Sequence, residues 1–232
     1  MSDFGAGSPY VAAMKAAVLK ACPRAQLIDI DHSLPPFEVS LASFVLWAAT
    51  RDFAPGTVHL AVVDPGVGGE RRAVAVEAGG CFYVGPDNGL LTTVIGRRRD
   101  LAAVSLARPK AASPTFEGRD VFAPAAGALA AGALLADLGK PVTDLVVLPD
   151  PGPSVVWVDG FGNLVTNLEP PIARLRINGV EVRLGVRTFA EAPAGQSFWY
   201  VGSLGLVEIA VREDRADRVL GAGRGTRVRA VP

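Results

Sequence analysis

The sequence predicts an α/β protein with two domains, in which a largely parallel sheet with helices is followed by a smaller antiparallel β-rich domain. Through the first half of the 232 residues, short β-branched runs alternate with stretches of helical spacing, which is typical of parallel α/β sheets. Through the last third, strand-like runs follow one another with glycines between them, as in antiparallel β domains. Hydrophobic residues make up 50% of the chain, so it can bury a sizeable core.

The first domain opens with a Ser-Asp-Phe-Gly turn at residues 2–5, and a helix is expected to follow it. Apolar side chains predict that helix by their spacing, at Val11, Met14, Val18 and Leu19. The same reasoning predicts a second helix over Leu41–Arg51. β-Branched runs predict three strands, at Gln26–Ile30, Thr57–Val63 and Ala73–Glu77.

Acidic or amide residues stand at the ends of several of these apolar runs, at Asp31, Asp64 and Asp87–Asn88. Open α/β sheets hold their ligands at the carboxyl ends of the strands. We therefore expect the functional site along that edge of the sheet.

The segment LPDPGPS, residues 148–154, cannot continue a helix or a central strand and is predicted to be a linker. It separates a predicted α/β domain, residues 1–149, from a β-barrel-like domain, residues 154–232. Six short runs predict the strands of the second domain, at Val155–Val158, Leu164–Leu168, Arg174–Ile177, Val180–Val186, Ser197–Val201 and Val207–Val211.

The charge balance argues for a small or zwitterionic ligand. Lys+Arg and Asp+Glu are equal, at 23 each, so no strong field attracts nucleic acid or an anionic membrane. The two cysteines and two histidines lack zinc-ligand spacing, and no G-x-S-x-G elbow of a serine hydrolase is present. The sequence shows no leader or membrane-length apolar segment, so we expect a cytoplasmic protein. From the spacing of the cysteines and histidines, we expect that it holds no metal.

The stretch VVDPGVGGERR, residues 62–72, contains the first candidate site. Asp64 follows a strand, and the Pro- and Gly-rich turn lets Arg71 fold back onto it. A carboxylate and a guanidinium so placed could polarise a water molecule. The same pair could instead stabilise a tight turn, which the spacing alone favours.

Two further stretches carry candidate side chains. In TFEGRD, residues 115–120, Glu117 and Asp120 stand at a predicted helix start, where capping is a more common role than catalysis. In DGFGNLVTN, Asp159 and Asn163 suit recognition of an amine or an adenine edge, although turn formation explains them nearly as well.

Seven segments in a fixed order carry a resemblance that covers nearly the whole chain: SDFG, DIDHSLPPF, FAPGTVHLAVVDPGVGGERR, GPDNGLLT, TFEGRDVFAPAA, DGFGNLVTN and GSLGLVEIAV. The sequence thereby resembles the S-adenosylmethionine (SAM) hydroxide adenosyltransferases, the family that also contains the fluorinase and the chlorinase. The resemblance implies an α/β domain, a β-rich domain, and a homotrimer with active sites between subunits. It also implies SAM as the substrate, with no cofactor.

The resemblance implies roles for individual residues. Asp3 would hold the ribose hydroxyls, Phe37 would stack on the ligand, and Asn163 would read the adenine. Asp159 and Ser203 would hold the methionine amine and carboxylate. It also places Ser8, Phe116 and Tyr200 among the substrate-binding residues.

Asp64 and Arg71 match the pair that hydroxide-using members are thought to place around the attacking water. The halogenases carry a tyrosine at the Asp64 position, and an ionised carboxylate there repels a halide. The expected reaction is therefore hydrolysis of SAM to adenosine and L-methionine, by attack of water on the ribose 5′-carbon.

Three departures from the family pattern leave alternatives open. Glu117 replaces a histidine of the proposed water-activating group, Ser8 stands where an acidic residue is usual, and the apolar strand that precedes SDFG in relatives is not part of this sequence. Glu117 could share Arg71 with Asp64 and give a usable base, or it could disable the site. The alternative functions are a catalytically silent protein that binds SAM or adenosine, and a relative that has lost the site.

Overall fold

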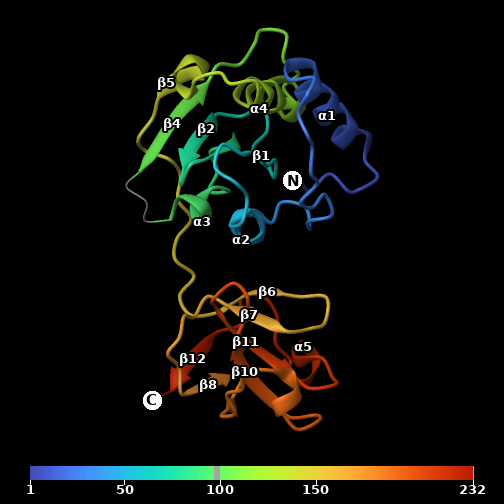
Figure 1. Ribbon diagram of the computed structural model, residues 1–232, viewed down its shortest axis with the longest axis vertical. Helices are drawn as coiled ribbons and strands as arrows, with labels where there is room; N and C mark the ends of the chain where they lie inside the picture. The colour runs from blue at the N-terminus through green and yellow to red at the C-terminus, as the bar shows by residue number, and fades with distance from the viewer. Residues whose placement is uncertain (97–99, 232) are drawn as a thin grey trace. The chain divides into compact units, whose positions relative to one another are not determined.

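The computed structural model describes residues 1–96 and 100–231. The chain divides into two compact units, Met1–Leu148 and Pro149–Pro232. The first unit holds a five-stranded sheet with helices, and the second consists mainly of short strands (Figure 1). The predicted α/β class with a β-rich second part is confirmed.

The sheet of the first unit is mixed, so the prediction of a largely parallel sheet is wrong. Its strand order is β1 (Val58–Leu60), β3 (Cys81–Pro86), β2 (Ala73–Ala78), β4 (Leu101–Leu106) and β5 (Gly139–Pro141). Only β1 and β3 pair in parallel, whereas the other three pairings are antiparallel. The reason lies in the turn between β2 and β3, where Gly79 and Gly80 both have positive φ. Such a two-residue turn closes a hairpin, whose strands are necessarily antiparallel.

Gln26–Ile30 does not form the strand predicted for it. Together with α1 and β1, this segment lines a cavity of about 430 Å³. One hydrogen bond ties its end to the sheet region, from the Ser2 amide to the Asp31 carbonyl (2.9 Å), while Ser2 also pairs with Val62. A segment becomes a strand only when a neighbour takes up its backbone groups. None of the predicted site residues lines this cavity.

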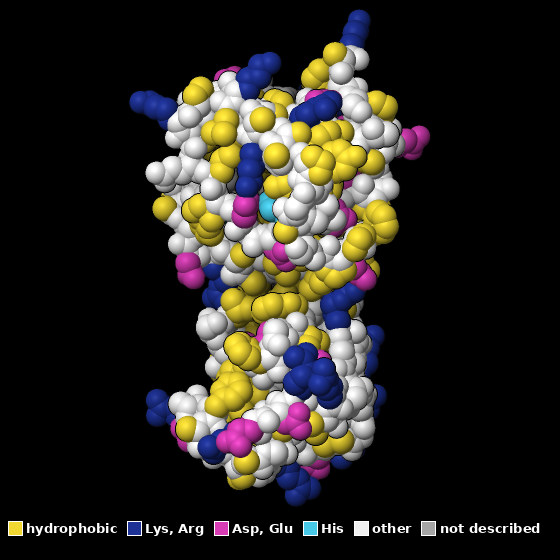
Figure 2. All heavy atoms as spheres, turned by 90° about the vertical axis from the view of Figure 1, so that its right-hand side faces the viewer, with side chains coloured by type: hydrophobic (Ala, Val, Ile, Leu, Met, Phe, Trp, Pro, Cys, Tyr) yellow, Lys and Arg dark blue, Asp and Glu magenta, His cyan; other side chains and the backbone are white. Residues whose placement is uncertain are grey.

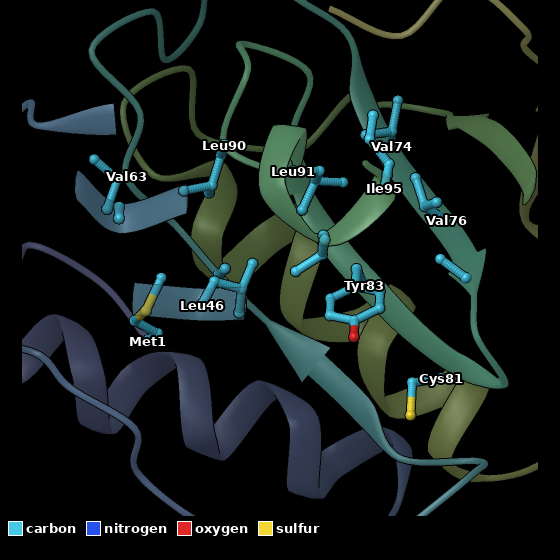
Figure 3. Close-up of a cluster of buried hydrophobic side chains, with 14 of the residues drawn as sticks. Met1, Leu46, Val63, Val74, Val76, Cys81, Tyr83, Leu90, Leu91 and Ile95 are labelled. Carbon is cyan, nitrogen blue, oxygen red and sulfur yellow. The ribbon is translucent and has the colours of Figure 1, made fainter. Parts of the chain in front are cut away.

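Helices cover both faces of the sheet. Helices α1 (Pro9–Ala21) and α4 (Ala123–Ala130) pack on one face, and α2 (Val39–Thr50) and α3 (Thr92–Ile95) pack on the other. Alternate side chains of β2 supply the two cores, since Val74 and Val76 face α2 whereas Ala75 faces α4. Figure 3 shows the α2-side core, where side chains from α2, β2 and β3 point toward one another.

Two short helices complete the first unit. A π-helical turn, η1 (Gly118–Phe122), leads directly into α4, and a 3-10 turn, η2 (Leu135–Leu138), precedes β5. The predicted helix start at TFEGRD thus falls on η1. Glu117 is the last residue before it.

The second unit contains two antiparallel sheets around a shared core. One sheet has the order β10 (Ser197–Val201), β11 (Val207–Val211), β7 (Leu164–Thr166) and β6 (Val155–Val158), and the other has the order β12 (Val228–Val231), β8 (Arg174–Ile177) and β9 (Val180–Val182). The shared core includes Leu175 and Ile209, one from each sheet. A short helix, α5 (Ala216–Val219), and a 3-10 turn, η3 (Phe189–Glu191), lie between strands. The prediction of an antiparallel β-rich second part is confirmed, and β12 is a strand that the sequence reading missed.

Within residues 1–96 and 100–231, no helix combines the length and the apolar character needed to cross a membrane. Charged side chains of both signs are interspersed with hydrophobic ones on the face drawn in Figure 2. The equal numbers of basic and acidic residues are thus also mixed in space on that face.

His59 on β1 is expected to make stability depend on pH. Its ring lies between Phe53 and Tyr83, at centroid distances of 5.2 and 4.9 Å, and its Nε2 atom is buried without a hydrogen bond. Burial lowers the pKa of His59 to about 4, so the unfolded chain binds a proton there first as the pH falls. Stability should therefore drop by about 2 kcal/mol between pH 6.5 and 4. Unfolding by urea at several pH values should show a flatter profile for His59→Phe; an unchanged profile would contradict this.

Candidate active site

The first group of predicted residues lies where two parallel strands end. β1 and β3 run side by side, so the segments that follow them meet at one edge of the sheet. Asn88, just after β3, donates from Nδ2 to the Val63 carbonyl (3.0 Å) and accepts from the Leu90 amide (3.1 Å). The turn that follows β3 therefore holds Val63, the residue immediately before Asp64, in place.

Asp64, Arg71 and Glu117 form a buried cluster at this edge. Arg71 Nε donates to Asp64 Oδ1 (2.9 Å), and Nη2 contacts the second carboxylate oxygen. Arg71 Nη1 lies 2.6 Å from Glu117 Oε2. The three side chains are at most 9% exposed. Such a fork between guanidinium and carboxylate fixes both groups in orientation.

The turn that joins Asp64 to Arg71 explains the pairing. Gly68 has a φ of 75° and packs against the Pro114 carbonyl, so that a side chain there would both strain the backbone and collide. This contact brings the turn against the segment that leads to Glu117. Beneath the cluster, the Phe122 ring lies 5.2 Å from the Arg71 guanidinium carbon.

Electrostatics keep Arg71 charged. Burial lowers its pKa, but the hydrogen bond and charge of Asp64, followed by those of Glu117, outweigh burial and raise the pKa above its ordinary value. The guanidinium therefore acts as a fixed cation and not as a proton donor.

Glu117 does not cap a helix, since its side chain makes no capping hydrogen bond. It binds a second arginine instead, with Arg108 Nε 2.7 Å from Oε1. Sequence reasoning missed Arg108. The sequence did contain a signal for such a partner, because a carboxylate at position 117 can be buried only if a cation lies nearby.

One contact of the cluster joins two fully buried atoms. Arg71 Nη1 and Glu117 Oε2 lie 2.6 Å apart, so each is the other's partner in a buried ion pair. Among the described residues, no group of three or more His, Cys, Asp or Glu side chains could hold a metal ion.

Asp3 and Phe37 lie together. Asp3 Oδ2 accepts a hydrogen bond from the Phe37 amide (3.0 Å), and Phe37 adopts a positive φ of 68° with 71% of the residue exposed. A positive φ is uncommon outside glycine and marks a constrained position. The exposed ring is therefore held on a fixed backbone, free to stack on a planar ligand.

Phe116 is placed by other aromatic rings. Its ring packs edgewise against Phe4 and Tyr10, at centroid distances of 6.0 and 5.0 Å. Phe4 follows Asp3 in the chain, and Phe116 precedes Glu117. The aromatic group thus connects the segment of Asp3 with the segment of Glu117.

Ser8 has a structural role at the start of α1. Its hydroxyl accepts from the Tyr10 amide (3.3 Å), and Pro9 occupies the first helical position. We expect Ser8→Ala to lower the free energy of unfolding by about 1 kcal/mol through loss of the cap. Urea unfolding checks this value, and Ser8→Asp, which keeps the cap, is the control. Equal destabilisation by both variants would contradict the capping role.

The second group of predicted residues belongs to the second unit. Asp159 accepts from the amides of Phe161 (2.9 Å) and Asn163 (2.8 Å) and from Asn163 Nδ2 (2.8 Å). Asp159 and Asn163 are therefore brought together by one tight turn before β7. Ser203 is exposed in the turn between β10 and β11.

Tyr200 is tied to a buried acid. Its hydroxyl donates to Glu208 across the β10–β11 pair. Burial raises the pKa of Glu208, and the charge of Asp159 adds to this effect. Burial and the contact with Glu208 also raise the pKa of Tyr200, so the phenol stays protonated. Glu208 is a further residue that sequence reasoning did not identify.

Comparison with known families assigns the chain. Residues 1–139 match the SAM hydroxide adenosyltransferase N-terminal domain, and residues 153–229 match the corresponding C-terminal domain. The chain belongs to the SAM hydroxide adenosyltransferase family. The two matches fall on the two compact units.

Two relatives that are named as hydrolases match the chain over nearly their whole length, and a fluorinase matches over a smaller share. The chain is 43% identical to the (R)-S-adenosyl-L-methionine hydrolase of Thermus thermophilus, covering 99% of this chain and 97% of the relative. It is 40% identical to the protein of the same name from Salinispora arenicola, with coverages of 98% and 95%. A fluorinase from an Actinoplanes species is 29% identical, with coverages of 77% and 70%.

Two solved structures share the fold of this chain. The crystal structure of an uncharacterized conserved protein from Thermotoga maritima superimposes with a TM-score of 0.91 at 33% identity, covering 99% of this chain and 98% of that one. A conserved hypothetical protein from Thermus thermophilus superimposes with a TM-score of 0.84 at 40% identity, with coverages of 100% and 97%.

Proposed function

We propose that the protein hydrolyses S-adenosyl-L-methionine to adenosine and L-methionine. The observation that carries this proposal is the buried cluster of Asp64, Arg71 and Glu117. It is set in a chain that is 40–43% identical to proteins named (R)-S-adenosyl-L-methionine hydrolase. The relatives' name also leads us to propose a preference for the R configuration of the sulfonium.

The chemistry asked of the cluster is modest. The oxygen of a water molecule attacks the ribose 5′-carbon, and the carbon–sulfur bond breaks with its electron pair moving to sulfur. Methionine leaves as a neutral thioether, so no acid has to protonate it. The site has to hold the water in line and accept its proton.

The cluster supplies both functions. Asp64 is the proton acceptor, and Arg71 fixes its carboxylate through two contacts. Arg71 and Glu117, which form one cluster with Asp64, would orient the water. The two carboxylates disfavour a halide in the same position, because like charges repel strongly at a buried site.

Other predicted residues would bind the substrate. Asp3 would hold the ribose hydroxyls beside the exposed ring of Phe37, which would stack on the ligand. Asn163 donates its amide hydrogen to Asp159, which leaves Oδ1 to accept from the adenine amino group. Further contacts are proposed for the methionine amine, the methionine carboxylate and the rest of the ligand, by Asp159, Ser203, Ser8, Phe116 and Tyr200.

We also propose the assembly and setting implied by the family. The substrate-binding α/β domain comprises residues 1–149 and the β-barrel-like domain residues 154–232. The protein acts as a cytoplasmic homotrimer with active sites between subunits, and without a cofactor. Light scattering should give three times the chain mass of 24.1 kDa; a monomer that is fully active would contradict this assembly.

The experiment that tests the proposed function is a product analysis. Purified protein is incubated with each sulfonium epimer of SAM, with and without chloride, and the products are separated by chromatography. We expect equal amounts of adenosine and methionine, faster formation from the R epimer, and no chlorinated nucleoside. SAM that is bound in calorimetry but stays intact over long incubation would replace the proposal with the silent binding protein.

A further inference from the structure

A further charged side chain, Arg108, follows β4 and contacts the Asp64–Arg71–Glu117 cluster from outside. Arg108 Nε lies 2.7 Å from Glu117 Oε1, on the side of the carboxylate away from Arg71. Its side chain is 38% exposed, whereas that of Glu117 is 3% exposed. Arg108 therefore covers a buried carboxylate from the solvent side.

Arg108 also holds the turn that carries Arg71. Its Nη2 atom donates to the carbonyl of Arg71 (2.6 Å) and to that of Gly69 (3.2 Å). The Arg108 guanidinium thus contacts both the Glu117 side chain and the backbone carbonyl of Arg71. Removing it would loosen the turn and the carboxylate together.

The charges of the cluster balance only when Arg108 is included. Asp64 and Glu117 each contact Arg71, and two buried carboxylates that share a single cation compete for it. In such a pair one carboxyl group takes up a proton well above its ordinary range. With Arg108, two guanidinium groups face two carboxylates.

We infer that Arg108 is a positioning residue for hydrolysis, which acts by holding the Glu117 carboxylate and the turn that carries Arg71. This inference rests on the proposed function. It adds a residue outside the Asp64–Arg71–Glu117 cluster, and it explains how a glutamate is accommodated beside Asp64.

The test compares pH–rate profiles of hydrolysis. Arg108→Ala should lower kcat about tenfold with little change in KM, and should move the acidic limb of the profile upward by about one pH unit. Arg108→Lys, which keeps the charge, should return the limb toward its original position. The double variant R108A/E117Q has a balanced charge and should also return it. Lys110→Ala, which removes an exposed cation from the same loop, is the matched control and should leave the profile unchanged.

A second readout does not depend on turnover. In Arg108→Ala the raised carboxyl pKa makes the folded state bind more protons, so its stability should fall relative to the parent protein as the pH rises from 5 to 8. R108A/E117Q should abolish this trend. An unshifted acidic limb together with parallel stability profiles would overturn the inference. If SAM is not hydrolysed at all, the proposed function fails, and the stability profiles alone decide the role of Arg108.

Discussion

Asp64→Asn should lower kcat for SAM hydrolysis about a thousandfold, with a much smaller effect on KM. The amide keeps the size of the carboxylate but cannot accept the proton of the attacking water. It also breaks the charge pairing with Arg71, whose Nε donates to Asp64 Oδ1 at 2.9 Å. The proposed substrate contacts lie on other side chains, so binding should largely persist.

Steady-state kinetics with chromatographic detection of adenosine measures this effect. The control is Asp144→Asn, which removes the carboxylate from a different aspartate–arginine pair, where Asp144 is 79% exposed and bound to Arg72. The control should retain the activity of the parent protein. A loss below about tenfold in Asp64→Asn would show that another group accepts the proton.

Arg71→Ala should lower the free energy of unfolding by about 3–5 kcal/mol, because it leaves two buried carboxylates without their shared cation. Asp64 and Glu117 are 4% and 3% exposed in the parent protein, so each carboxylate loses a buried partner, while Glu117 keeps its contact with Arg108. Their pKa values in the folded variant should rise above those of the unfolded chain. The variant should therefore be least stable, relative to the parent protein, at neutral pH, and should recover as the pH falls toward 5.

Urea unfolding at pH 5 and pH 7.5 measures both the loss and its recovery. Arg119→Ala is the control, because Arg119 forms its pair with Asp120 at the surface, where its side chain is 45% exposed, and its removal should change stability little. A destabilisation of Arg71→Ala that is the same at both pH values would show that lost packing, and not unpaired charge, dominates.

Helices α1 and α2 and most strands could be predicted because their signals are local, whereas α3, α5, β3, β4 and β5 were not predicted. Leu41–Arg51 differs from the observed α2 (Val39–Thr50) by a residue or two at each end. The sheet type could not be predicted from alternation alone, since the Gly79–Gly80 hairpin makes β2 and β3 antiparallel. That signal was present in the sequence as two glycines between apolar runs. Gln26–Ile30 has strand composition, but its hydrogen-bonding neighbours depend on the rest of the fold.

In the candidate site, too, contacts between residues close in the sequence could be predicted, whereas contacts between distant segments could not. The Asp64–Arg71 contact follows from a short Pro- and Gly-rich turn and could be anticipated from spacing. The contact of Glu117 with both arginines spans segments far apart in the chain, so local reasoning assigned it to a helix cap. Ser8 caps α1 in the structure, a role that the sequence analysis did not predict although serine is a preferred residue at that position.

The measurement that tests the central claim most directly is hydrolysis of SAM in water enriched in oxygen-18. Mass spectrometry of the products then locates the oxygen that enters. If water attacks the ribose 5′-carbon at the Asp64 cluster, adenosine carries one heavy oxygen and methionine carries none. Unlabelled adenosine, or heavy oxygen in the amino-acid product, would contradict the account, because the attacking oxygen would then have another source or another target.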